Sequence, residues 1–261
     1  RSAEVTRRRL VSTFVSAAVI VAGLTGCGGS TSPTPSTSTD GTPLTSDQAT
    51  VLARTLYRSY EERGATFQAT AQIEADVRLV MSGRFNFRAS SGQMLLQVAR
   101  GGGPLSAGRD VVWTKRAVFE GDIPGLEAAM AKRGRPGVRW VERPVDVKAS
   151  PVDAVVSMIT RLASTRPDNP ILIQQDDNVL LGSQTRDGET LQTFRLANRL
   201  VLDIGADGTI RQARAELAGA NVPITVTLSS YGPQQIVVPP AAARVKLSSI
   251  RGLYRQLIAD A

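Results

Sequence analysis

The sequence predicts an α+β domain built on an antiparallel β-sheet that is strongly curved and covered on one face by helices. Three observations lead to this fold class. Segments follow one another in the order helix, strands, helix, strands, helix. The strand-like segments are separated by short turns such as Asp187-Gly188 and Asp207-Gly208, which join neighbouring strands as antiparallel pairs. One strand-like run is too long to stay straight, and a curved sheet accommodates it.

The first helix and the strand after it carry the clearest patterns. The helix is expected to start at Ser46 or Asp47, either of which can cap it, and to stop at Gly64. Over residues 67–81 apolar and polar side chains then alternate, so that one face of a strand is apolar and the other is wet. At ~3.3 Å per residue this run would be about 50 Å long, and it must bend or break.

The rest of the chain continues the same pattern. Further hairpins are expected over residues 85–98, and a helix is expected over residues 151–164, where Pro151 suits the first turn. The remaining elements are strands at 111–113, 118–119, 138–141, 179–185, 190–196, 199–204, 210–217 and 224–231, a short helix at 126–132, and a closing amphipathic helix at 247–258.

The composition argues against an enzyme and against a metal or cofactor site. The 261 residues contain no histidine and one cysteine, which removes the Ser-His-Asp and Cys-His nucleophilic systems and the His-containing zinc sites. Carboxylate pairs occur at Asp176-Asp177 and at Glu74 and Asp76, but the first pair is typical of a turn and the second lies on the wet face of a strand. We therefore expect no catalytic residues, no metal and no cofactor.

The net charge of +8 is scattered along the chain rather than concentrated. The densest basic group, Lys132, Arg133 and Arg135, has no interleaved aromatic residues on which bases could stack. We therefore expect no nucleic-acid partner. A mild attraction to an anionic membrane or an acidic glycolipid headgroup is compatible with this charge.

Residues 1–26 have the layout of a secretory signal peptide. Arg7, Arg8 and Arg9 precede an apolar stretch over residues 10–24, and small residues precede Cys27. As a helix, residues 10–26 would span only about 25 Å, less than the ~30 Å hydrocarbon core of a bilayer. The quartet Leu24-Thr25-Gly26-Cys27 resembles a bacterial lipobox, which implies that Cys27 carries the lipid anchor of a protein at the extracytoplasmic face of the cell membrane. The alternative is a buried or incidental thiol.

Residues 27–46 predict a tether between this anchor and the domain. From Gly28 to Asp47 the chain is dominated by Ser, Thr, Pro and Gly, and Leu44 is its only larger apolar residue. Such a segment cannot bury enough surface to offset the entropy of ordering. The domain is therefore expected over residues 47–261.

The stretch over residues 225–240, TVTLSSYGPQQIVVPP, resembles the closing strand of the actinobacterial LppX/LprA/LprF/LprG lipoproteins. The lipobox, the polar tether, the first helix and the curved strand agree with that family. The resemblance implies a LolA-like or LolB-like fold, in which a half-open antiparallel sheet has helices on its concave face and encloses an apolar cavity for lipids. The Arg-rich loops around Arg133 and Arg143 and the charged segment over residues 244–255 depart from the family pattern.

The leading hypothesis is a membrane-anchored protein that binds or transfers lipids or lipoglycans, whose acyl chains enter an apolar groove while the headgroup stays at a polar rim. This hypothesis also allows a transporter protein in the cell envelope as a further partner. The alternative is an envelope protein-interaction or sensing module with a filled core, since each candidate lining residue also suits an ordinary core. The candidate lipid-binding residues are Val77, Leu79, Met81, Phe85, Phe87, Met94, Leu96 and Trp113.

Overall fold

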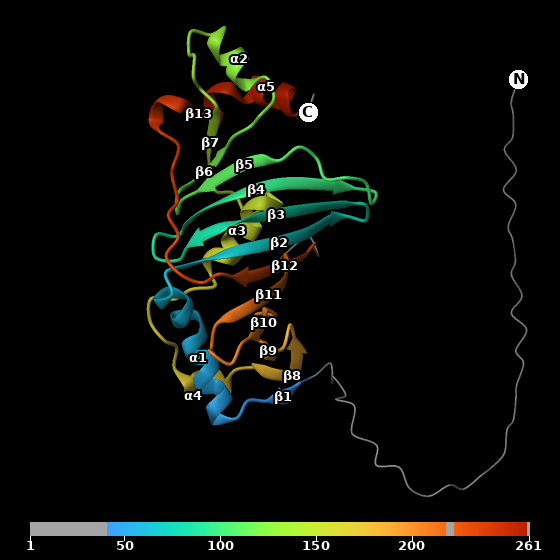
Figure 1. The fold of residues 1–261 in the computed structure, drawn as a ribbon, viewed down its shortest axis with the longest axis vertical. Helices are drawn as coiled ribbons and strands as arrows, with labels where there is room; N and C mark the ends of the chain where they lie inside the picture. Colours follow the sequence, from blue (N-terminus) through green and yellow to red (C-terminus); the bar gives the residue numbers. More distant parts are fainter. Residues whose placement is uncertain (1–40, 218–221, 260–261) are drawn as a thin grey trace, which may run out of the picture. The chain divides into compact units, whose positions relative to one another are not determined.

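The predicted antiparallel sheet is present in the computed structural model, which describes residues 41–217 and 222–259. Thirteen strands form one sheet in the order β1-β8-β9-β10-β11-β12-β2-β3-β4-β5-β6-β7-β13. Neighbouring strands are antiparallel, except that β13 runs parallel to β7. Because β1 and β13 each have a neighbour on one side only, the sheet does not close (Figure 1). The α+β fold class with a half-open sheet is confirmed.

The strands are short at both edges of the sheet and long at its centre. The sheet consists of β1 (Thr42–Pro43), β2 (Gly64–Glu74), β3 (Val77–Asn86), β4 (Ser91–Arg100), β5 (Arg109–Trp113), β6 (Ala117–Glu120), β7 (Trp140–Pro144), β8 (Val179–Arg186), β9 (Glu189–Arg195), β10 (Val201–Ile204), β11 (Ile210–Leu217), β12 (Val222–Ser229) and β13 (Arg244–Lys246). The helices are α1 (Ser46–Glu61), α2 (Leu126–Ala131), α3 (Pro151–Thr160), α4 (Pro170–Gln175), α5 (Leu247–Ala259) and the 3-10 turn Ala241–Ala243.

The main hydrophobic core lies on the concave face of the sheet. Inward-facing side chains from β9 through β6 in the strand order join α1 and α3 in one continuous cluster. In Figure 1, α3 is seen behind β2 and β3, on the face away from the viewer. Helix α4 packs against α1. The predicted covering of the concave face by helices is thus confirmed for α1 and α3.

The long alternating run breaks at its centre. Residues predicted as one strand form β2 and β3, which pair as a hairpin with Met81 opposite Ala69. Alternation continues through both strands, because hairpin partners that lie opposite each other point to the same face. The excess length therefore folds back on itself.

Helix α1 starts and ends differently from the prediction. Thr45, rather than Ser46 or Asp47, is its N-cap: the Thr45 hydroxyl accepts the Gln48 N–H, and the Gln48 side chain accepts the Thr45 N–H. Gly64 does not end the helix; the chain reverses at Arg63, whose φ of 70° is left-handed. Gly64 instead opens β2, where a Cβ would lie 2.5 Å from the carbonyl oxygen of Phe85.

The last residues of the predicted tether take part in the fold. Thr42 and Pro43 pair with Leu180 and Val179 of β8, and Leu44 is buried in the main core. The remainder of the tether up to residue 40, the predicted signal peptide and Cys27 lie outside the described residues. Among the described residues, no helix has the length and apolarity required to cross a membrane.

A second, smaller core lies at the β13 edge of the sheet. Helices α2 and α5 enclose it together with β7 and β13, and its buried members include Leu126, Val141 and Ile250. The closing helix of the prediction is therefore present as α5, but it packs on this second core and not on the concave-face cluster. The backbone of α5 is kinked at Ile250.

Candidate functional site

The concave face holds most of the candidate lipid-binding residues in one cluster. Side chains of β3 and β4 that point inward are Leu79, Met81, Phe85, Met94 and Leu96. The cross-strand register explains why they meet, because Met81 lies opposite Leu96 on one side and opposite Ala69 on the other. Phe87 and Trp113 belong to the same cluster, whereas Val77, at the start of β3, is not part of it.

Aromatic rings form the densest part of this cluster. The Phe85 and Trp113 rings stack with centroids 5.8 Å apart, and Phe67 meets Trp113 edge-on at 6.1 Å. Trp113 lies opposite Gly92 of β4, and a Cβ on that glycine would overlap the indole ring. The absence of a side chain at Gly92 therefore makes the space in which the indole lies.

The candidate residues are buried rather than open to solvent. Six of them have between 0% and 9% of their surface exposed, and only Val77 and Leu96 are half-buried. Helix α3 covers them, with Val155, Ile159 and the following Leu162 completely buried in the cluster. The alanine-rich face of β2 leaves the room that a helix needs. In this structure the helix fills that room.

One polar atom in this apolar cluster has no partner. The indole N–H of Trp113 is buried and, within the described residues, donates no hydrogen bond. A buried donor without an acceptor costs free energy comparable to a lost hydrogen bond, so most such groups in proteins are paired. The sequence singled out Trp113 as an apolar residue only, and nothing in the sequence pattern indicates the orientation of its N–H.

A buried ion-pair network fixes one end of α3. Arg143 of β7 donates to both carboxylate oxygens of Asp153, at 2.6 and 2.8 Å, and to Glu120 of β6 at 2.6 Å. Asp153 is completely buried and also accepts from the Ser150 hydroxyl at the start of the helix. Burial opposes the charge of Arg143, but the hydrogen bonds to Asp153 and Glu120 raise its pKa above the usual value.

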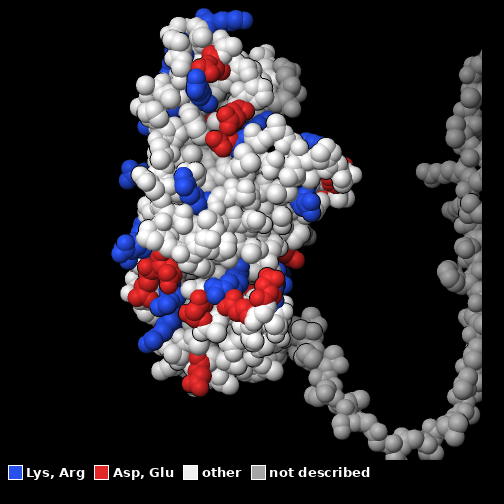
Figure 2. Space-filling model, viewed as in Figure 1, with Lys and Arg blue, Asp and Glu red and all other residues white. Residues whose placement is uncertain are grey.

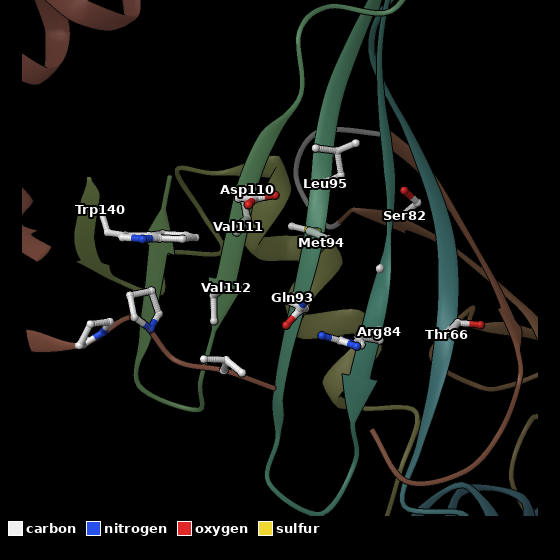
Figure 3. A pocket seen from close by; sticks show the side chains of 14 residues that line it. Thr66, Ser82, Arg84, Gln93, Met94, Leu95, Asp110, Val111, Val112 and Trp140 are labelled. Atoms are coloured by element: carbon white, nitrogen blue, oxygen red, sulfur yellow. The ribbon is translucent and has the colours of Figure 1, made fainter. Parts of the chain in front are cut away.

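The outer face of the sheet carries a separate, open groove of about 630 Å³ (Figure 3). Arg84, Gln93 and Val112 point into it from β3, β4 and β5, and Trp140 of β7 also lines it. The extended segment that ends in Pro239 and Pro240 runs along it. Of the candidate lipid-binding residues only Met94 borders this groove. Charged side chains are sparse over the central strands on this face (Figure 2).

The carboxylate pairs noted in the sequence do not form a site. Asp176 ends α4 as its C-cap, and Glu74 is exposed at the end of β2. A buried carboxylate is instead found at Asp203 of β10, which forms ion pairs with Arg186 and Arg214. In the part of the chain that the structure describes, no three His, Cys, Asp or Glu side chains lie close enough to hold a metal ion.

Comparisons with known proteins find similarity only in structure. No family model matches the chain, and no curated protein matches it. One similar solved structure is LprF from Mycobacterium bovis, with 12% identity, 77% of this chain and 100% of that chain covered and a TM-score of 0.40. An uncharacterized conserved protein from Thermus thermophilus has 13% identity, 75% and 96% coverage and a TM-score of 0.38.

A LolA superfamily protein from Nitrosomonas europaea is similar at 7% identity, with 74% of this chain and 96% of that chain covered and a TM-score of 0.29. LprF and the LolA superfamily are the groups that the sequence resembles, so the similarity expected from the sequence is also found in structure. With identities this low and TM-scores below 0.5, these likenesses carry no conclusion about ligand or activity.

Proposed function

We propose that the chain is a membrane-anchored, extracytoplasmic lipid-binding protein without enzymatic activity. In this proposal Cys27 carries the anchor, and acyl chains enter between α3 and the inward-facing residues of β2 to β4. The unpartnered indole N–H of Trp113 carries the proposal. An ester carbonyl of a bound lipid supplies the acceptor that this buried donor lacks, while its chains replace the contacts that α3 makes.

The packing of α3 supports such an exchange. The helix has ten residues and packs on β2, where Ala69 and Ala71 of the same cluster offer less contact area than larger residues would. Moving α3 would uncover the cluster that contains Met81 and Phe85. An acyl chain that took its place would bury the same apolar surface, so the net cost of exchange would be small.

Native mass spectrometry with lipid identification tests this function. The protein to use is residues 37–261, purified from an actinobacterial host, because this unit contains both cores and every strand pairing of the described residues. We expect a stoichiometric lipid. A lipid with a photoreactive acyl chain should label β3, β4 or α3, and labelling confined to the outer-face groove would contradict the proposed site.

Trp113→Phe gives a matched test of the donor. This variant keeps an aromatic ring in the cluster and removes the N–H, so we expect retention of lipid to fall while the fold persists. Trp140→Phe, in the outer-face groove, is the control and should retain lipid as the unaltered protein does. Equal retention by both variants would show that the Trp113 N–H does not contact the ligand.

A second candidate function is supported by the filled concave face. With six of the candidate residues buried under α3, the domain is complete without a ligand, as a protein-interaction or sensing module would be. A protein that is purified free of lipid, and that stays free when lipid extracts are added, favours this second function. Binding of one lipid per chain excludes it as the sole function.

A further inference from the structure

A second groove, which we call the α5 groove, lies between α5 and strands β6 and β7. Its volume is about 1060 Å³, and five cationic side chains line it. One of them, Arg143, is bound by Asp153 and Glu120. The other four are Arg116, Lys246, Arg251 and Arg255. Arg251 and Arg255 are one turn apart on α5, Lys246 directly precedes the helix, and Arg116 lies in the turn before β6. All four are exposed. The groove is separate from the concave-face cluster and shares no candidate lipid-binding residue with it.

The carboxylates of the α5 groove are already engaged. Glu120 accepts from Arg143 and from the Tyr254 hydroxyl, and Glu142 pairs with Arg244 at 3.5 Å. Asp146 accepts the backbone N–H groups of Lys148 and Ala149, each at 3.2 Å. The carboxylates beside the groove are therefore bound by groups other than the four cations.

The four cations themselves have no such partners. Within residues 41–217 and 222–259, none of their side chains forms an ion pair or a hydrogen bond. Like charges four residues apart on a helix destabilise it slightly, as Arg251 and Arg255 do on α5. Folding alone would favour a carboxylate at one of these positions. The groove thus holds positive charge that an anionic ligand can neutralise.

The shape and lining of the groove indicate the kind of anion. Leu247, Ala117 and Pro144 supply apolar surface between the cations, and Tyr254 adds an aromatic ring. Phosphates above an apolar layer are the pattern of a phospholipid surface, for which basic side chains over apolar ones are complementary. The groove also lies at the β13 edge of the sheet, the edge opposite β1, so a bilayer can approach it without meeting the β1 edge.

We propose that the α5 groove docks this end of the domain on an anionic phospholipid bilayer, with Arg116, Lys246, Arg251 and Arg255 contacting headgroup phosphates. Docking does not require α3 to move and does not depend on the lipid site proposed for the concave face. A carrier that binds lipid in its core and docks through this groove would meet the membrane with a defined end of the sheet.

Co-sedimentation with vesicles tests the docking. Residues 37–261 are mixed with vesicles of phosphatidylglycerol and phosphatidylcholine in equal parts, or of phosphatidylcholine alone. We expect binding to the anionic vesicles at about 50 mM salt and its loss at about 500 mM, because exposed charges are screened over a few ångströms at high salt. Arg251→Glu combined with Arg255→Glu should weaken binding at least about tenfold, since each basic side chain contributes to attraction near the surface.

A matched variant separates the groove from net charge. Arg78→Glu combined with Arg100→Glu changes the charge equally on exposed side chains of β3 and β4, and it should bind as the unaltered protein does. Equal weakening by both double variants would overturn the site. Arg116→Glu combined with Lys246→Glu should reproduce the loss, and it also tests the groove if the α5 variant does not fold.

Inorganic phosphate distinguishes a bilayer from a soluble anion. Absence of binding to the anionic vesicles at low salt would overturn the docking proposal, and saturable binding of phosphate alone in calorimetry would then assign the groove to a free anion. The concave-face function is measured separately, by the lipid that is retained through purification. Failure of one proposal can therefore be told apart from failure of the other.

Discussion

Arg143 of β7 binds Asp153 of α3 through two parallel hydrogen bonds of 2.6 and 2.8 Å, and the Asp153 carboxylate is completely buried. This fork joins the helix that covers the concave face to the strand beside the second core. A buried bidentate pair requires strict geometry. Both charged groups lose their hydration, and only the hydrogen bonds between them offset the free-energy cost of that loss. The position of α3 is therefore coupled to that of β7.

Asp153→Asn should be strongly destabilising. The variant leaves the largely buried Arg143 with only Glu120 as a charged partner, and we expect the free energy of unfolding to fall by about 3 kcal/mol. Urea denaturation measures it. Glu127→Gln, which breaks the exposed pair with Arg139, should cost less than about 1 kcal/mol. Similar losses for the two variants would show that the buried pair contributes no more to stability than the exposed pair does.

Two glycine substitutions should have opposite signs. Gly92→Ala places a methyl group in the space of the Trp113 indole and should destabilise the domain by about 2 kcal/mol. Gly252→Ala, on α5, meets no atom within 4 Å and should stabilise by about 0.5 to 1 kcal/mol, because alanine loses less entropy in a helix. Thermal unfolding of both variants checks the pair. A neutral Gly92→Ala would mean that the indole can shift.

Stability should decline at alkaline pH through two tyrosines. Burial raises the pKa of Tyr231, and burial together with the charge of Glu120 raises the pKa of Tyr254. A pKa that is higher in the folded state contributes stability below the unfolded value of about 10, and this contribution is lost as pH rises through the folded value.

The measurement is the free energy of unfolding between about pH 8 and pH 11. Replacing both tyrosines by Phe should flatten its decline above about pH 10, because the phenols no longer titrate in the unfolded chain. If the double variant declines as steeply as the unaltered protein, other groups cause the alkaline loss.

Removing the residues before Asp47 should weaken the domain. Residues 47–261 lack β1, the buried Leu44 and the Thr45 cap of α1. Loss of the leucine burial costs about 2 kcal/mol and loss of the cap about 1 kcal/mol. Compared with residues 37–261, we expect the free energy of unfolding to be lower by that combined amount, about 3 kcal/mol, and the urea denaturation midpoint to fall with it. Equal midpoints would mean that these residues only border the domain.

The periodic patterns of the sequence determined the fold class and most of its elements. The alternation over residues 67–81 and the turns at Asp187-Gly188 and Asp207-Gly208 reflect local chemistry, which side-chain period and backbone preference express directly. Helix α3 and the closing helix α5 were predicted for the same reason. The edge strands β1 and β13 were not, because elements of two and three residues have too few positions to show a period. Helix α4 was also not predicted.

Only the tertiary structure decided what fills the concave face and where the charges meet. The sequence indicated that Met81, Phe85 and Trp113 face a common side, but whether a helix or a ligand covers them depends on the path of the chain around α3. The α5 groove brings Arg116 together with Arg251 from far along the sequence. Contacts between distant segments follow from how strands order in the sheet, and a local pattern carries no information about that order.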